Sequence, residues 1–328
     1  MISAIDLAAI GCVPTISASV GIGGRNRPMD VAIVQHLMSC QYRGNSVLDL
    51  YPPTGFCDTA LEQAILLYQK EEEKLAKPTG LALPSGSTIK KLRKTHDKYW
   101  VPSVWSGEEN ISRFTAVDST LLVKLVQLQW GTLKQEAQDG VRSLMARMID
   151  DAQLYDLRWA AYMFATIKGE TGIYQPIPEG KALWSLSTGA GKYAEEVSPK
   201  DPAGATYKNA AGQPVKHRYY GRGYVQLTWL KNYRKLGAAI GRGDTLVENP
   251  ELALDPDVAY AIASLGMREG SFANDKAGKP MSLKRFISGS YCKYKWARQI
   301  INGNDRDDEL AGYAVIFEGL MLLAAQKP

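Results

Sequence analysis

The sequence is poor in the residues that most often hold metal ions. It contains only three histidines and four cysteines in 328 residues, with no HExxH and no CxxC motif. We therefore predict neither a metal site nor a cofactor. Three of the four cysteines fall in the first 57 residues, so at most one disulfide is expected there, and reduced, partly buried thiols are favoured. The four are Cys12, Cys40, Cys57 and Cys292.

Long apolar runs are also missing, and no segment approaches the 18 or more apolar residues of a membrane-spanning helix. The first 24 residues lack a basic start, and Asp6 interrupts their apolar stretch, so they do not resemble a secretory signal. We predict that the protein is synthesised in the cytoplasm and does not insert into a membrane. If it acts outside the cytoplasm, a route other than a secretory signal must take it there. The net charge of +5 is too small to favour nucleic acid as the partner.

Tryptophan is absent from the first 95 residues, and all seven tryptophans lie at or beyond Trp100. This step in composition predicts two modules. We place the first at residues 1–98, a linker at 99–114, and the second module at 115–328. Turn residues and apolar spacing in the first module predict three short helices, one after Pro28, one starting near Thr59, and one after residue 87.

Short motifs in this first module resemble the peptidoglycan-binding module of cell-wall hydrolases. The segment VQHL contains Val34, Gln35 and Leu37, and the segment AILLYQ runs from Ala64 to Gln69. A turn from Thr88 to Leu92 completes the pattern. The resemblance covers roughly residues 15–95 and implies a small helical unit that binds the cell wall.

The second module begins with helical patterns, and one of them ends on a conspicuous carboxylate. In the segment DLRWAAYMFATIKGETG, Trp159, Met163 and Ile167 recur every four residues, and Glu170 follows three residues later. This spacing places Glu170 on or near the buried stripe, in the last turn of the helix. A carboxyl group in such a position is a candidate general acid.

A second informative segment, HRYYGRGYVQLTWLKNY, interleaves aromatic side chains with amides, hydroxyls and arginine. Flat apolar rings beside directional hydrogen-bonding groups suit a sugar chain. The preceding stretch, residues 185–216, is rich in Gly, Ala, Ser, Thr and Pro and predicts an excursion with a turn at Ala211 and Gly212. Strand signals are otherwise scarce, so we expect a mainly α domain with a minor β-hairpin.

Four segments together resemble the family 19 glycoside hydrolases, which have a chitinase-like lysozyme fold, and especially their bacterial and phage cell-wall lysozymes. Besides the two segments above, they are NPELALDPDVAYAIASLGMREGSF and ARQIINGNDRDDELAGYAVIFEGL, all in the family's order over residues 115–328. The resemblance implies a lysozyme-like catalytic domain and inversion at the anomeric carbon, with the two carboxyl groups about 6.5–9.5 Å apart.

Carried over by motif, the resemblance makes Glu170 the general acid and Glu179, nine residues later, the general base for water. Thr228 would hold that water. The remaining candidates would bind substrate or fix the carboxylates, and they are Tyr220, Arg222, Gln226, Trp229, Asn232, Arg298 and Asn302.

Two features depart from the family's chitinases. Those enzymes usually have His directly before the catalytic Glu, whereas Gly169 stands here. The second acid of plant chitinases lies farther along the chain, which keeps Glu195 and Glu196 as rival bases.

The resemblances together predict a monomeric muramidase that hydrolyses peptidoglycan, either as a phage endolysin or as a type VI effector. An effector would come with an immunity protein. A chitinase or a lytic transglycosylase is the alternative enzyme, and a wall-binding protein without activity is the non-enzymatic one. The enzyme would act on the periplasmic cell wall, after holin action in a host cell or after secretion into a target cell.

Overall fold

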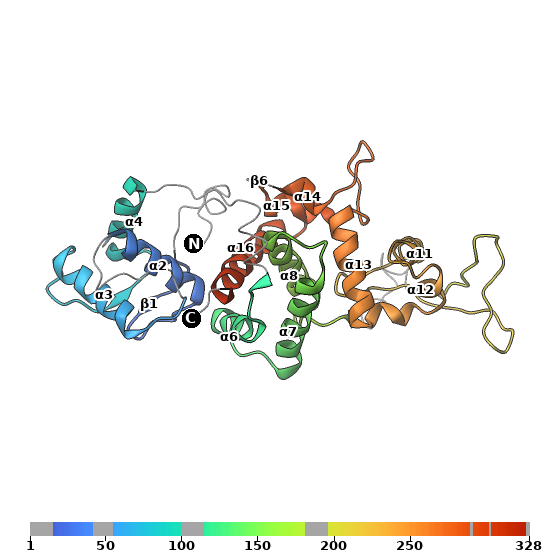
Figure 1. Cartoon of the computed structure of the whole chain (residues 1–328), viewed down its shortest axis with the longest axis horizontal. Helices are drawn as coiled ribbons and strands as arrows, with labels where there is room; N and C mark the ends of the chain where they lie inside the picture. Colours follow the sequence, from blue (N-terminus) through green and yellow to red (C-terminus); the bar gives the residue numbers. More distant parts are fainter. Residues whose placement is uncertain are drawn as a thin grey trace.

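The computed structural model describes residues 16–41, 55–99, 115–180, 196–288, 291–301 and 303–325. These residues are mainly helical, as the sequence predicts, and three antiparallel pairs of two-residue strands supplement the helices (Figure 1). No described helix is long and apolar enough to cross a membrane.

Three helices and one strand pair form the N-terminal part. They are β1 (Val20–Gly21), α2 (Pro28–Gln41), α3 (Thr59–Glu71), β2 (Leu81–Ala82) and α4 (Ser87–Tyr99), and β1 pairs with β2. The second helix starts at Thr59 as predicted, and Asp58, the residue before it, caps α3 by accepting from the Leu61 N–H at 2.8 Å.

The polar residues of the N-terminal motifs are buried and fasten loops. The Gln35 amide oxygen accepts from Gly55 N, and its amide nitrogen donates to Phe56 O. Gln69 accepts from Gly80 N and donates to Leu81 O in the same way. These glutamines therefore stabilise the fold of the N-terminal part.

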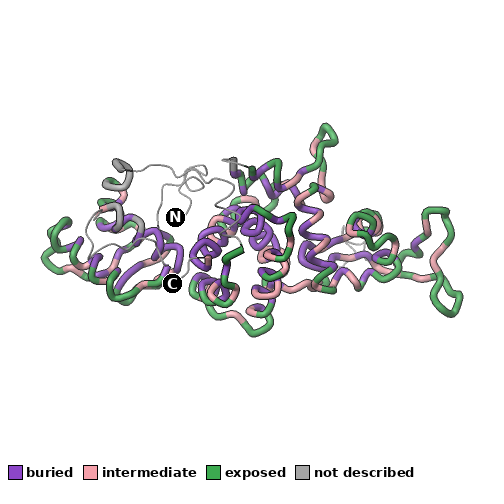
Figure 2. Tube along the Cα trace, viewed as in Figure 1, coloured by how far each residue is buried: buried purple, intermediate pink, exposed green. Residues whose placement is uncertain are grey.

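The remainder of the chain is built around α8 (Leu157–Thr171) and α16 (Asp307–Ala324), which pack against each other in the middle of the molecule (Figure 1). Side chains from Leu157 through Ile167 are all buried, so α8 is buried on every side over that stretch, and not along one stripe (Figure 2). The other helices around this pair are α6 (Ser119–Trp130), α7 (Gln135–Asp150), α13 (Pro256–Glu269), α14 (Leu283–Phe286) and α15 (Tyr294–Ala297).

Short elements complete this part. They are β3 (Ile177–Pro178), β4 (Arg222–Gly223), α11 (Leu230–Ala239), α12 (Thr245–Glu248), η1 (Pro250–Leu254), β5 (Ile287–Ser288), β6 (Tyr291–Cys292) and η2 (Arg298–Ile300). Asp118 caps α6 and Asp255 caps α13. The hairpin of residues 196–217 projects beyond α12 and is mostly exposed (Figures 1 and 2). Its turn ends at Gly212 as predicted, but isolated bridges replace the two short strands.

The described residues form two hydrophobic clusters, and α2 contributes to both. Val34 and Leu37 belong to the N-terminal cluster, whereas Met29 and Ala32 belong to the large cluster around α8 and α16. A Cβ on Gly319 of α16 would lie 2.0 Å from Met29 Sδ, so the glycine is needed for this close packing. The predicted boundaries at 98 and 115 stay a prediction, since residues 100–114 lie outside the described part.

Candidate active site

The candidate acid Glu170 lies where α8 leaves the core. Its side chain is 16% exposed, and its Oε1 accepts a hydrogen bond from Arg298 Nη1 at 3.0 Å. Arg298 is 3% exposed and also donates through Nε to Asp305 O at 2.8 Å. The sequence linked Arg298 to the carboxylates only through the family resemblance, and the structure places it in direct contact with one.

The end of α8 is held a second time, by a residue that the sequence analysis missed. Arg306 precedes α16 in a left-handed conformation, with φ 54°, and its Nη1 donates to Gly169 O at 3.1 Å. Its other nitrogens bind Glu309, whose carboxylate also accepts from Tyr313. These contacts lower the pKa of Glu309 to about 2, with the Arg306 hydrogen bond as the largest cause.

Gly169 replaces the histidine of the family's chitinases, and its surroundings explain the small residue. A Cβ at this position would lie 2.7 Å from Leu310 Cδ2 on α16. The space beside the acid is therefore occupied by α16 in this chain. The only signal for this arrangement in the sequence was the departure at Gly169 itself, together with the RDDEL segment of the fourth family motif.

The candidate base Glu179 follows β3 and is bound to the glycine-rich loop. Its backbone N–H donates to Gly221 O at 2.7 Å, and its Oε2 accepts from Gly221 N at 3.0 Å. A Cβ on Gly221 would lie 2.9 Å from Gln226 Oε1 and 3.3 Å from Glu179 Oε2. A side chain at this position would therefore require Gln226 and Glu179 to shift.

The connection between the two carboxylates is anchored in the core. Tyr174 lies between α8 and β3, is 1% exposed and packs against Phe164 and Phe317. Its φ of 56° is a strained conformation for a bulky residue, and strain of this kind is found where surrounding structure holds a functional segment. The connection that contains Tyr174 carries one candidate carboxylate at each end.

Gln226 and Arg222 hold the loop around Glu179. Gln226 donates through Nε2 to Ile177 O on β3 at 3.0 Å and to Gly223 O at 3.1 Å. Arg222 was predicted to bind substrate, but it is 3% exposed, and its guanidinium binds Glu251, two backbone carbonyls and Tyr233. The structure therefore makes Arg222 a positioning residue of the loop.

The exposed end of the same loop presents the predicted sugar-binding side chains. Trp229 is 38% exposed and has φ 72°, and Thr228 beside it is half-buried. Asn232 donates through Nδ2 to Thr228 O at 2.8 Å. Tyr220 is half-buried, with the Arg222 guanidinium carbon 3.6 Å from its ring centroid. Of the other candidates, Asn302 and the rival base Glu195 lie outside the described residues.

Glu196, the second rival base, lies in a different setting from Glu179. It is exposed on the hairpin of residues 196–217 and forms an ion pair of 3.7 Å with Arg218. In the described ranges, no group of three or more His, Cys, Asp or Glu side chains is placed to hold a metal ion. Cys57 is a free thiol and Cys292 is buried, whereas Cys12 lies outside the described residues.

A mainly helical fold with one carboxylate at a helix end and another on a strand pair beside an aromatic, polar loop has the features of a lysozyme-like glycoside hydrolase. Residues 148–277 match the sequence profile of glycoside hydrolase family 19, described as "Chitinase class I". This part of the chain is therefore similar to the family 19 glycoside hydrolases. Both Glu170 and Glu179 lie within the matched region.

Curated relatives are plant chitinases that match short stretches of the chain. "Endochitinase A2" of Pisum sativum is 32% identical over 107 residues, which is 32% of this chain and 30% of that protein. "Basic endochitinase B" of Arabidopsis thaliana is 35% identical over 109 residues, or 32% and 29%. "Acidic 26 kDa endochitinase" of Solanum lycopersicum is 51% identical over 47 residues, or 14% and 19%. The chain thus spans a third or less of the length of these relatives, and no solved structure matches it.

Proposed function

We propose that the protein is a peptidoglycan hydrolase that cleaves the β-1,4 bond between N-acetylmuramic acid and N-acetylglucosamine with inversion. The observation that carries this proposal is the placement of the two carboxylates. Glu170 binds Arg298, and Glu179 binds the Gly221 N–H, at the two ends of the segment that contains Tyr174. Glu170 would protonate the glycosidic oxygen as the bond breaks. Glu179 would take the proton from the attacking water, which Thr228 would hold.

The substrate part of this proposal draws on the N-terminal motifs. A wall-binding unit joined to a hydrolase raises the local concentration of the enzyme on an insoluble polymer. The buried roles of Gln35 and Gln69 fit a unit that folds as those motifs imply. A phage endolysin and a type VI effector with an immunity protein are the two settings in which we expect such an enzyme to act on the periplasmic wall.

Chitinase activity is the second candidate function, and the names of the plant relatives favour it. Chitin shares the β-1,4-linked N-acetylglucosamine backbone, and the two candidate carboxylates would act on it in the same way. The two substrates are distinguished by testing both.

The experiment is mass spectrometry of soluble products from purified peptidoglycan and from chitin oligomers, with the wild type and two variants, Glu170→Gln and Glu179→Gln. We expect reducing-end N-acetylmuramic acid fragments from the wild type and a rate loss of about 10²–10⁴-fold in each variant. Glu196→Gln is the matched control and should keep activity within about twofold, because its carboxylate is exposed and paired with Arg218.

Other outcomes would contradict particular parts of the proposal. Anhydro ends from peptidoglycan together with an active Glu179→Gln variant would show a lytic transglycosylase. Turnover of chitin oligomers with no release from peptidoglycan would show a chitinase. Nuclear magnetic resonance of the first anomer formed tests inversion directly.

A further inference from the structure

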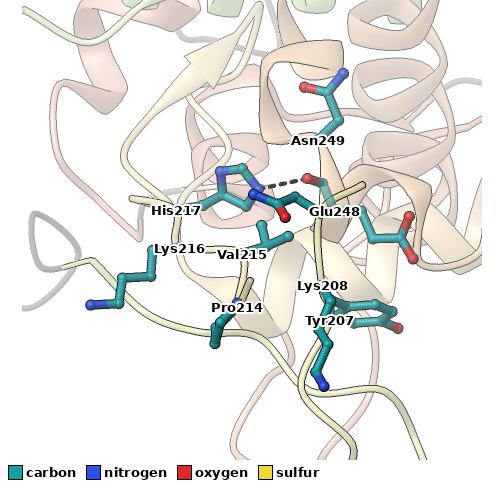
Figure 3. Close-up of a pocket in the computed structure, with 9 residues that line it drawn as sticks. Tyr207, Lys208, Pro214, Val215, Lys216, His217, Glu248 and Asn249 are labelled. Atoms are coloured by element: carbon teal, nitrogen blue, oxygen red, sulfur yellow. Dashed lines mark hydrogen bonds between the residues drawn. The ribbon is translucent and has the colours of Figure 1, made fainter. Parts of the chain in front are cut away.

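A pocket outside the carboxylate site lies between the hairpin of residues 196–217 and the junction of α12 with η1 (Figure 3). Its volume is about 590 Å³, within the range of about 300–1,000 Å³ that is usual for ligand pockets. We call it the hairpin pocket, and it is lined by Tyr207, Lys208, Asn209, Pro214, Val215, Lys216, His217, Glu248 and Asn249.

The walls of the hairpin pocket are fixed. The His217 Nε2–H donates to Glu248 O at 2.6 Å, which joins the hairpin to the end of α12 (Figure 3). Asn209 stabilises the hairpin turn, because its Oδ1 accepts from Ala211 N and Gln213 N, each at 3.0 Å. Tyr207 donates its hydroxyl hydrogen to Asp244. The pocket is therefore a preformed hollow.

The lining contains two lysines, Lys208 and Lys216, and one acidic side chain, Glu248, so its basic groups outnumber its acidic ones. Three other acidic side chains around the pocket already have basic partners. Asp244 binds Arg234 at 3.2 Å, Glu251 binds Arg222 at 2.6 Å, and Glu196 binds Arg218 at 3.7 Å.

Two lysines of the lining remain without such partners. Lys208 and Lys216 form no ion pair or hydrogen bond through their ammonium groups within the described part of the chain. They extend on either side of Pro214 and Val215, whereas the carboxylate of Glu248 turns away from His217 (Figure 3). The lining thus offers two ammonium groups to an anionic ligand.

The hairpin pocket is joined to the loop that holds the candidate base. His217 precedes Gly221 by four residues, so the pocket wall lies within roughly 14 Å of Gly221. The Tyr219 hydroxyl donates to Val247 O at 2.6 Å, and this bond ties the loop to α12. A substituent on a glycan strand bound along the loop could reach the pocket.

We propose that the hairpin pocket binds carboxylates of the peptide stems that substitute peptidoglycan, which rests on the proposed function. Chitin is uncharged, whereas the stems of peptidoglycan carry free carboxylates next to amide groups. Because their side chains extend in opposite directions (Figure 3), Lys208 and Lys216 would each pair with a separate stem carboxylate, and Asn209 and Asn249 would meet the stem amides. The pocket would then favour stem-bearing glycan over bare glycan.

The test compares the full-length wild type with Lys208→Gln/Lys216→Gln on two substrates, soluble peptidoglycan strands with intact stems and the same strands after amidase treatment. We expect KM for the stem-bearing strands to rise about three- to tenfold, as two exposed ion pairs allow, with kcat within about twofold. KM for the stripped strands should not change. Lys276→Gln/Lys279→Gln is the matched control, because it removes the same charge from another exposed turn and should change neither value.

Equal losses on both strands, a loss of the same size in the control, or an unchanged KM would overturn the proposal. Binding is measured separately, by nuclear magnetic resonance titration of the wild type with a free stem peptide and with its fully amidated form. Saturable shifts at the hairpin with the acidic peptide, and none with the amidated peptide, support the pocket. They do so even if the protein hydrolyses only chitin, and in that case only the proposed function is refuted. No shift, or stronger shifts with a teichoic acid fragment, would overturn the pocket's assignment.

Discussion

Arg298 should stabilise the protein mainly through Glu170, and a double-mutant cycle measures this. The variants are Arg298→Gln, Glu170→Gln and the two together. Loss of one partner of a buried ion pair costs about 3–5 kcal/mol, and we expect about 3 kcal/mol for Arg298→Gln because Glu170 keeps 16% of its side chain exposed. Part of this loss comes from the hydrogen bond that Arg298 donates to Asp305 O. The double-mutant cycle subtracts that part, because it does not depend on Glu170.

We expect a coupling energy of about 1–3 kcal/mol between Arg298 and Glu170 from urea unfolding of the full chain. The exposed pair Arg306–Glu309 is the internal control, since its side chains are 43% and 40% exposed and such pairs contribute about 0.2–1 kcal/mol. Arg298→Gln should also lower kcat, because the acid loses the group that orients it. A coupling for Arg298 and Glu170 no larger than that of the control pair would refute the reasoning.

Three further predictions concern the loop and α16. Gly223→Ala should lower the free energy of unfolding by about 2 kcal/mol or more, since φ is 82° and a Cβ would lie 2.7 Å from Ala253 O; urea unfolding measures it, and a loss below 1 kcal/mol would contradict the close approach. Trp229→Gly should raise KM severalfold while stability falls little, because glycine relieves the strain at φ 72°; kinetics and thermal unfolding check both. Glu309→Gln should remove an acid-dependent loss of stability: the folded pKa of about 2 lies below the ordinary value of 4.5, so stabilisation is present above pH 4.5 and disappears as the pH falls towards 2. Thermal unfolding from pH 2 to pH 6 should show a flatter profile in that variant than in the wild type.

Local signals predicted the helices well and their packing less well. Caps such as Asp118 and Asp255 are local features, because a cap depends on the few residues that follow it. At α3, two neighbouring side chains can cap, and only the backbone decides that Asp58 does so. Burial of α8 on all sides could not be read from a four-residue repeat, since it depends on α16, more than 130 residues away.

The same limit applies to the site. Glu170 and Glu179 came from motifs that lie close together in the sequence. Arg222 looked like a substrate contact beside aromatic residues, but its guanidinium binds Glu251, which lies in another segment. Arg306 was missed because its bond to Gly169 O joins residues 137 positions apart.

The two candidate carboxylates rest on different supports, and this has consequences for variants. Glu170 extends from a helix packed against α16 and is restrained by Arg298 at its side chain and by Arg306 at the neighbouring carbonyl. Glu179 depends on a two-residue strand pair and on the space left by Gly221. Substitutions in α16 should therefore act on protonation of the leaving group, and those in residues 219–233 on activation of water. Since α16 also packs on α2 through Gly319, changes in the N-terminal part can reach the acid through α16.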